Sequence, residues 1–187
     1  MPIASRRSRS TARLRVLSDR VAFRGDGVGE VHQARIGFPS GAVRIWTYLI
    51  KRPFVMVLAI RGNRVVLVRQ HRYPQGFAWE VVKGGIERGE TSLAAAKREL
   101  REETGYTARR WQRIARIMVA PGYFNQASAV YVAMNLRVGT PSPEANGEIL
   151  RVAVVTAARV RQMIARGAVY DSTTLAGLLL ARRFFPL

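Results

Sequence analysis

The sequence of 187 residues contains no cysteine. This absence excludes disulfides, thiol nucleophiles and cysteine-ligated zinc or iron–sulfur centres, and it fits a reducing compartment. Any metal site must therefore use oxygen or histidine ligands. The two histidines, His32 and His71, are not spaced as a ligand pair, so oxygen ligands are the expectation.

Long apolar runs are also missing. The longest, at residues 54–60 and near residue 178, fall far short of the roughly 20 residues that span a bilayer, which predicts a soluble protein without a membrane partner. The first twenty residues carry six arginines and no apolar core, so they are not a secretory signal. We expect residues 1–20 to form a basic, disordered tail, with a transit peptide as the alternative, and we expect a cytoplasmic protein.

Negative charge is scarce, with 12 Asp and Glu against 31 Lys and Arg and a formal net charge of +19. Such a balance predicts an anionic partner. Nucleic acid is the less favoured partner, because the 28 arginines are spread along most of the chain, as genome composition often produces. A small anionic substrate would be attracted by the same net positive charge.

The scarce acids are concentrated in one place. Six of the twelve lie between residues 80 and 103, namely Glu80, Glu87, Glu90, Glu99, Glu102 and Glu103. Thr91 or Ser92 can cap a helix that ends at Gly105, and in that helix the last three of these acids share one side. Like charges at this spacing destabilise a bare helix, whereas a bound hard cation such as Mg²⁺ reverses the effect. The alternative interpretation is a solvated face whose charge Arg98 and Arg101 offset.

The remaining pattern predicts an α/β domain in which helices cover a mixed sheet. Strands are expected at residues 30–38, 42–50, 54–60, 64–70, 79–82, 113–120, 127–136 and 149–155. Gly62 and Asn63 predict a hairpin turn, and residues 139–147 predict a loop. Two further helices are expected, from Thr156 to Arg166 with Gly167 as the cap, and from Ser172 to Arg183.

The full spacing of the acidic segment resembles the Nudix box. Gly84 is followed after five residues by Glu90, after seven more by Arg98-Glu99-Leu100, and then by Glu102-Glu103 and Gly105. The resemblance covers 23 residues through Tyr106, where the family usually has an aliphatic residue, a departure that affects packing. It implies an α/β/α sandwich that uses Mg²⁺ or Mn²⁺ to hydrolyse a nucleoside diphosphate linked to another group.

The same resemblance implies roles for individual residues. Glu99 and Glu103 would be the main metal ligands, and Glu102 would contribute directly or through water. Glu90 and Arg98 would pair to hold the loop against the helix. A backbone carbonyl at Lys83 or Gly84 would complete the protein's share of the ligands.

Sequence outside the box narrows the substrate. Residues 68–85, VRQHRYPQGFAWEVVKGG, resemble the segment before the box in ADP-ribose pyrophosphatases, and Pro121 stands where enzymes acting on ADP-ribose have a proline. APGYF at residues 120–124 is closer to the ADP-compounds hydrolases, which accept ADP-ribose, diadenosine polyphosphates and reduced dinucleotide. One departure is Lys83-Gly84-Gly85 in place of the Pro-Ala-Gly common in ADP-ribose pyrophosphatases. A Lys-Gly pair at this place also occurs in dinucleoside polyphosphate and ADP-compounds hydrolases, so the substrate is narrowed but not fixed.

Further site residues follow with alternatives. Arg69 and Arg72 could hold the pyrophosphate through forked donors, or be ordinary surface arginines. The general base is expected to be Glu148, with Glu144 as the alternative, since both lie in the loop that carries a catalytic glutamate in ADP-ribose pyrophosphatases. Tyr123 and Phe124 are expected to line the nucleotide pocket or to pack in the core. Trp79, beside the box, is expected in the core.

Residues 21–50 resemble the small strand region that, in ADP-ribose pyrophosphatases, crosses to a partner subunit and helps to build the adenine site. A homodimer is therefore expected, with residues 51–187 as the hydrolase domain. The sequence favours a Nudix pyrophosphatase that cleaves ADP-ribose or a related ADP compound to AMP and a phosphorylated residue. Dinucleoside polyphosphates, NADH and sugar nucleotides such as GDP-mannose are the alternative substrates. A basic nucleic-acid-binding protein on a Nudix fold is the alternative without catalysis.

Overall fold

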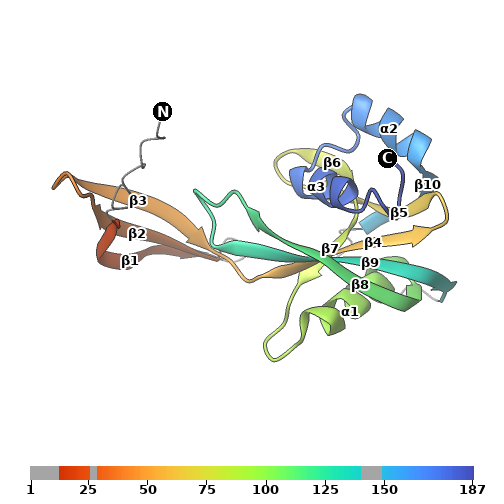
Figure 1. The fold of residues 1–187 in the computed structure, drawn as a ribbon, viewed down its shortest axis with the longest axis horizontal. Helices are drawn as coiled ribbons and strands as arrows, with labels where there is room; N and C mark the ends of the chain where they lie inside the picture. Colours follow the sequence, from red (N-terminus) through yellow and green to blue (C-terminus); the bar gives the residue numbers. More distant parts are fainter. Residues whose placement is uncertain (1–12, 26–28, 140–148) are drawn as a thin grey trace, which may run out of the picture. The chain divides into compact units, whose positions relative to one another are not determined.

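The computed structural model describes residues 13–25, 29–139 and 149–187 (Figure 1). The chain divides into two compact units. The first extends to Lys51 and also includes Ala120–Asn125, and the second comprises Arg52–Val119 and Gln126–Leu187.

The first unit is an antiparallel sheet of β1 (Arg15–Gly25), β2 (Gly29–Gly37) and β3 (Val43–Ile50), in that order. The expected strands at 30–38 and 42–50 are confirmed. The expectation of a tail through residue 20 is wrong for residues 15–20, which belong to β1. Polar side chains in this strand find partners across the ladder, as when Arg20 Nη2 donates to Gln33 Oε1 at 2.6 Å. A low apolar content therefore did not prevent strand formation.

The second unit is built on a seven-stranded sheet. Its strands are β4 (Phe54–Arg61), β5 (Arg64–Arg72), β6 (Gly76–Glu80), β7 (Val82–Gly85), β8 (Tyr106–Val119), β9 (Gln126–Val138) and β10 (Ile149–Thr156). The order is β10-β5-β4-β9-β8, with β6 paired to β5 and β7 to β4. Strands β4 and β9 are parallel and the other pairs antiparallel, which confirms the expected mixed sheet. The expected strand at 79–82 is divided between β6 and β7, and β8 begins directly after the preceding helix rather than at residue 113.

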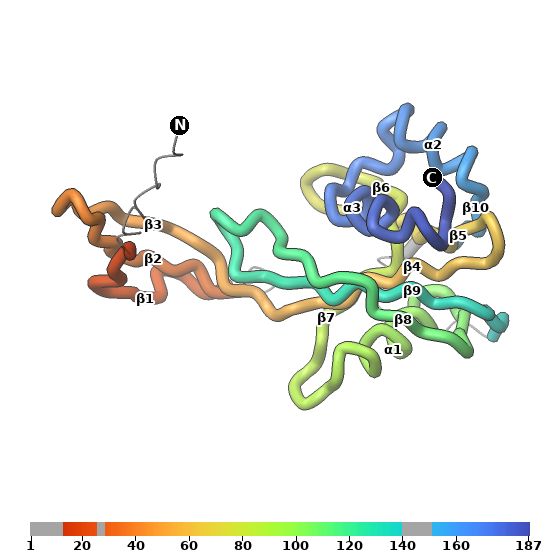
Figure 2. Tube along the Cα trace, viewed as in Figure 1, coloured from red at the N-terminus to blue at the C-terminus, as the bar shows by residue number. Residues whose placement is uncertain are grey.

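Three helices accompany this sheet in the described part of the chain: α1 (Ser92–Thr104), α2 (Ala157–Ala165) and α3 (Ser172–Leu180). The cap predictions for α1 are confirmed. The Thr91 side chain accepts from the Ala94 N–H at 3.2 Å, and Gly105 ends the helix in the left-handed region at φ 72°. Helix α3 ends earlier than expected, where the chain turns after Ala181. Figures 1 and 2 show α1 on one side of the sheet and α2 and α3 on the other, as in an α/β/α sandwich.

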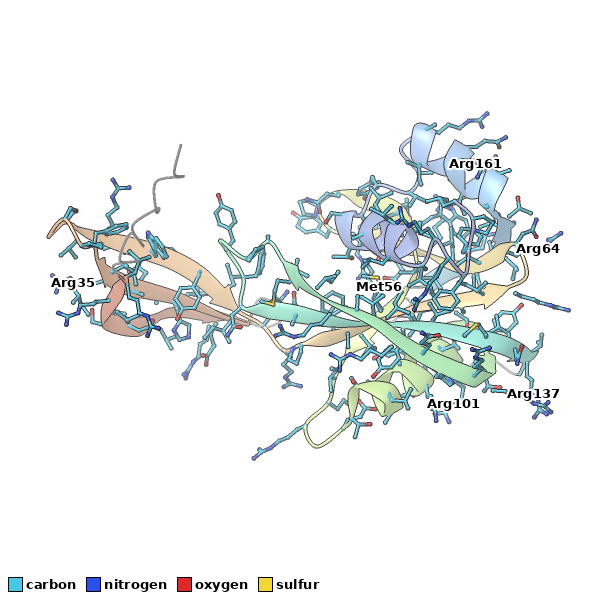
Figure 3. The ribbon with its side chains drawn as sticks, viewed as in Figure 1. Arg35, Met56, Arg64, Arg101, Arg137 and Arg161 are labelled. Carbon is cyan, nitrogen blue, oxygen red and sulfur yellow. The ribbon has the colours of Figure 1, made fainter. Side chains whose placement is uncertain are left out.

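The core consists of two clusters, one on each face of the sheet, because alternate residues of a strand point to opposite faces. On the α1 face, Val55, Val57, Val66 and Val68 pack with Ala95, Ala96 and Leu100. On the α2/α3 face, Met56 (labelled in Figure 3), Leu58, Val65 and Leu67 pack with Val160, Met163 and Leu178. The same alternation decides to which face each polar residue of β5 and β6 belongs. None of the helices in the described residues is long and apolar enough to cross a membrane.

Candidate active site

Arg98 is the centre of an ion-pair network that joins the glycine-rich loop to α1. Its guanidinium contacts the Glu90 carboxylate twice, Nε to Oε1 and Nη2 to Oε2, each at 3.1 Å. Nη2 also donates to the Gly85 carbonyl at 2.9 Å, and Glu90 accepts from the Glu87 N–H at 3.1 Å. Hydrogen bonding from Arg98 lowers the pKa of Glu90. The structure thus places Glu90 and Arg98 in the contact that ties loop to helix.

The same guanidinium reaches two more acids of the helix. Arg98 Nη1 lies 2.8 Å from Glu99 Oε1 and 3.1 Å from Glu102 Oε2. Hydrogen bonds to Glu90, together with the charge of Glu99, raise the pKa of Arg98, so it stays charged. Arg101 is farther away, 3.6 Å from Glu102, and is exposed. Arg98 therefore offsets part of the repulsion between Glu90, Glu99 and Glu102.

Glu99 lies directly over the glycine that precedes the loop. A Cβ built on Gly84 would fall 1.8 Å from Cδ of Glu99 and about as close to both its carboxylate oxygens, so no larger residue fits there without moving that carboxylate. Beside this contact is an open pocket of ≈ 270 Å³. Its walls include Arg52, Lys83, Gly84, Arg98, Glu99 and Glu103.

Glu103 is the most perturbed acid of the cluster. Burial, and then the charge of Glu99, raise its pKa to about 8, against the opposing effects of Arg72 and Lys83. One carboxylate oxygen, Oε1, accepts a long hydrogen bond of 3.4 Å from Gln70. The other, Oε2, is buried and has no hydrogen-bond partner among the described residues. An unpaired buried carboxylate oxygen is costly unless a proton or a cation satisfies it.

These residues fit a hard divalent cation. Within residues 13–25, 29–139 and 149–187, no three acids or histidines are already gathered as a metal cluster, since Arg98 contacts Glu99 and Glu102 while Glu103 contacts Gln70. Mg²⁺ and Mn²⁺ nevertheless take oxygen ligands such as carboxylates, and one carboxylate oxygen of Glu103 is buried without a partner among the described residues. A cation there would supply the positive charge that Glu103 lacks.

A second charged cluster adjoins the first and was missed by the sequence analysis. Lys83 Nζ lies 2.9 Å from Glu80 and 2.8 Å from Asp171, and Arg72 Nη2 lies 2.9 Å from Glu80. The Glu80 side chain is only 3% exposed. Asp171 also caps α3, accepting from the Thr174 N–H at 2.7 Å. The cluster therefore ties β5, β6 and β7 to the start of α3.

Asp171 is strongly acidic in this setting. Burial alone would raise its pKa, but the charge of Lys83 and hydrogen bonds from Lys83, Thr173 and Thr174 lower it to about 2. The Asp-Ser-Thr-Thr sequence is a cap signal that could have identified this residue as a helix start. Its pairing with Lys83, far away in the sequence, has no local signal.

The structure separates the two arginines expected to bind pyrophosphate. On β5, Arg72 pairs with Glu80, and its charge acts on Glu103 on the α1 side. Arg69 lies on the opposite face, where its guanidinium sits 4.6 Å from the ring centre of Phe77. The structure therefore does not bring Arg69 to the acidic pocket. Trp79 packs partly buried against the core of that same face, as expected.

The other expected site residues lie elsewhere in the chain. Tyr123 and Phe124 belong to the first unit, where Leu49 of β3 donates to the Tyr123 carbonyl at 2.8 Å and bridges to Phe124. Tyr123 is exposed. Glu144 and Glu148 lie outside the described residues, so their assignment as general base stays a prediction.

Comparison with known proteins gives a family match and two similar relatives. A family model described as NUDIX domain matches residues 50–178. The chain is 32% identical over 130 residues to an ADP-ribose pyrophosphatase of Bacillus subtilis (strain 168), covering 67% of this chain and 70% of that protein. It is 32% identical over 129 residues to an ADP-ribose pyrophosphatase of Mycobacterium tuberculosis (strain ATCC 25618 / H37Rv), covering 67% and 62%, so less than two thirds of that relative is matched.

The fold also matches a solved structure. The crystal structure of an ADP compounds hydrolase superimposes with a TM-score of 0.85 over 95% of this chain and 96% of that one, at 23% identity. At this identity the similarity concerns the fold.

Proposed function

The chain belongs to the Nudix hydrolases, and on that premise we propose that it hydrolyses the pyrophosphate bond of ADP-ribose or a related ADP compound. The products would be AMP and a phosphorylated residue, which is ribose 5-phosphate when ADP-ribose is the substrate. The similarity to two ADP-ribose pyrophosphatases supports this substrate class. The observation that carries the proposal is the buried, unpaired carboxylate oxygen of Glu103 beside Glu99 and Gly84.

The acidic pocket would hold Mg²⁺ or Mn²⁺ through Glu99 and Glu103, with Glu102 direct or through water and a backbone carbonyl at Lys83 or Gly84. When bound, such an ion neutralises pyrophosphate oxygens and makes water a better nucleophile. The protein's own residues position the acidic side chains. Arg98 holds Glu99 and Glu102 on one side of α1, and Glu90 holds Arg98 in place. Such preorganisation keeps the reacting groups in the geometry that the reaction needs.

Cationic side chains of the same pocket suit the phosphate groups. Arg52 and Lys83 line the pocket together with the acids. Arg72 contacts Glu80, which in turn contacts Lys83. Forked guanidinium donors match phosphate oxygens. Glu148, or else Glu144, is the proposed general base that takes a proton from the attacking water.

The first unit supports a homodimer. Several apolar residues of β1 and β3 are between 47% and 68% exposed, namely Val16, Leu17, Phe23, Ile45 and Trp46. Exposed apolar groups of this kind mark interaction surfaces, and a second copy of the chain is the partner that the family resemblance suggests. Tyr123 and Phe124, in the same unit, are proposed to contact the nucleotide. A cytoplasmic location stays a prediction from the lack of cysteine.

Dinucleoside polyphosphates are the second candidate substrate. Lys83 stands where ADP-ribose pyrophosphatases commonly have proline, and the Lys-Gly pair at this place resembles that of dinucleoside polyphosphate hydrolases. NADH and sugar nucleotides such as GDP-mannose are further candidates. Nucleic-acid binding without hydrolysis is the least favoured, since the box residues are all present.

Product analysis with ADP-ribose and Mg²⁺ tests the proposal. Wild type should release AMP and ribose 5-phosphate, and Glu103→Gln should lose most of this activity. Lys97→Gln, an exposed change on the same helix, should stay active and controls for helix integrity. Equal activity of wild type and Glu103→Gln would remove the proposed metal role. A panel with diadenosine polyphosphates, NADH and GDP-mannose then ranks the substrates.

A further inference from the structure

A second pocket lies on the face of the sheet opposite α1, against α2. Its volume is ≈ 260 Å³. The apolar part is formed by Trp79, Ala153, Val155 and Met163, and the cationic part by Arg151, Arg159 and Arg166. Trp79, Val155 and Met163 belong to the core cluster of the α2/α3 face. The acidic pocket shares none of these residues.

Strand register adds a fourth arginine to this surface. Arg69 of β5 pairs with Trp79 of β6 on one side and with Arg151 of β10 on the other. Directly paired residues of neighbouring strands point to the same face, so Arg69 lies between the other two. Its guanidinium covers the Phe77 ring. Arg69, expected from the sequence to bind pyrophosphate, thus stands beside this second pocket.

These arginines have no acid to balance them in the described part of the chain. None of Arg69, Arg151, Arg159 and Arg166 forms an ion pair there. The Arg159 guanidinium donates to the neutral side chain of Gln162, at 3.1 Å. The contrast with Arg72 and Arg98 is clear, because both of those contact carboxylates. Grouped cations around an apolar surface repel one another, and a bound anion would relieve the repulsion.

We propose that this pocket binds a small aromatic phosphate of the nucleoside monophosphate class. The ring would pack on Trp79 and its apolar neighbours, and the phosphate would accept hydrogen bonds from the guanidinium groups of Arg151, Arg159 and Arg166. The pocket, at ≈ 260 Å³, lies just below the range of about 300–1,000 Å³ that is typical of small-molecule sites, so it suits one small ligand rather than a polymer. The site is independent of the metal-dependent chemistry proposed above.

A backbone hydrogen bond and the geometry of β10 position the walls of this pocket. The Trp79 N–H donates to the Ala168 carbonyl at 2.9 Å, which fixes the strand carrying the indole to the segment after α2. Alternation along β10 places Arg151, Ala153 and Val155 on the same face. Trp79, Arg151 and Arg159 are therefore supplied by strands and a helix, and Arg166 by the cap that ends α2.

Titration of the full chain with AMP in EDTA, followed by tryptophan fluorescence, tests the inference. Metal-free conditions remove the cation through which AMP could bind in the acidic pocket, and the Trp79→Phe variant identifies the part of the signal that Trp79 provides. Wild type should show saturable quenching that Trp79→Phe lacks. The double variant Arg159→Gln/Arg166→Gln should bind AMP about tenfold more weakly or worse. Adenosine, without the phosphate, should be weaker by a similar factor.

Two controls separate this site from the rest of the molecule. Arg161→Gln removes an arginine of the same helix (Figure 3) that donates instead to the Pro186 carbonyl at 3.3 Å, and it should leave AMP binding unchanged. Glu103→Gln should keep the Trp79 signal, even if hydrolysis of ADP-ribose is lost. The inference is overturned if AMP gives no Trp79-dependent signal at millimolar concentration, or if the double arginine variant binds AMP as tightly as wild type.

Discussion

The carboxylate of Glu99 lies against Gly84 so closely that a Cβ on residue 84 would fall 1.8 Å from Glu99 Cδ. Gly84→Ala should therefore displace Glu99 from its place between the pocket and Arg98. A displacement of about 1 Å of a catalytic group can cost on the order of 10²-fold in rate. We expect kcat on ADP-ribose to fall by about that factor, measured at saturating Mg²⁺.

The neighbouring glycine provides the matched control for this prediction. A Cβ on Gly85 meets nothing within 4 Å, so Gly85→Ala should retain most of the activity. Both variants should melt within a few degrees of wild type. Similar kcat values for the two variants would show that the contact between Gly84 and Glu99 has no part in the reaction.

Arg98 is expected to be irreplaceable by lysine. Its planar fork reaches Glu90, Glu99, Glu102 and the Gly85 carbonyl at once, and a single ammonium cannot match that geometry. Arg98→Lys should lower the melting temperature by about 4–8 °C, which corresponds to roughly 2 kcal/mol in a chain of this size. Thermal unfolding by circular dichroism measures the change.

Arg101→Lys is the corresponding control on the same helix. Arg101, labelled in Figure 3, is 59% exposed, and its closest approach to Glu102 is a long 3.6 Å. Exposed ion pairs contribute roughly 0–1 kcal/mol to the free energy of unfolding. Its melting temperature should stay within about 2 °C of wild type. If the two lysine variants melt alike, the fork of Arg98 is not what holds the loop to the helix.

Local signals explain which parts could be predicted from the sequence. The cap at Thr91, the left-handed Gly105 and the acid spacing between them are all short-range, and the helix they predict is the one observed. The pairing of Lys83 with Asp171 joins residues that only the folded chain brings together. No pattern within a window of a few residues contains it.

Strand β5 shows a second limit. Its centre, Val65 to Val68, is fully buried on both faces, so no alternation of polar and apolar residues reveals which side faces α1. Arg69 and Arg72 therefore looked equivalent in the sequence, although pairing with β6 directs them to different surroundings. Strand β1 was missed for a related reason, since its polar residues are satisfied by partners on β2.

Asp171 should make stability depend on pH in the acid range. Its pKa is lowered to about 2 in the folded chain, from 3.8, so the unfolded chain binds more protons between these values and stability rises with pH there. The contribution should be about 2 kcal/mol above pH 4 and should disappear as the pH falls through about 2. Urea unfolding of wild type and Asp171→Asn from pH 2 to pH 7 measures it.

The lysine partner allows a check on this assignment. In a double-mutant cycle with Lys83→Met, the two changes should couple, because each removes one side of a contact of 2.8 Å. The difference between wild type and Asp171→Asn should shrink toward zero at the lowest pH. A difference that is the same at pH 2 and pH 7 would contradict the ion-pair explanation.

Glu103 should link metal binding to proton release near neutral pH. Burial and the charge of Glu99 raise its pKa to about 8, and a metal ligand must be deprotonated. Below pH 8, binding of Mg²⁺ should therefore release up to one proton, and affinity should increase by as much as about tenfold for each pH unit between 6 and 8 before it levels off. Calorimetry in two buffers of different ionisation enthalpy counts the protons.

Glu103→Gln should bind Mg²⁺ more weakly and lose this pH dependence, whereas Lys97→Gln should keep it. An unchanged slope in Glu103→Gln would assign the proton to another group and remove Glu103 from the metal site.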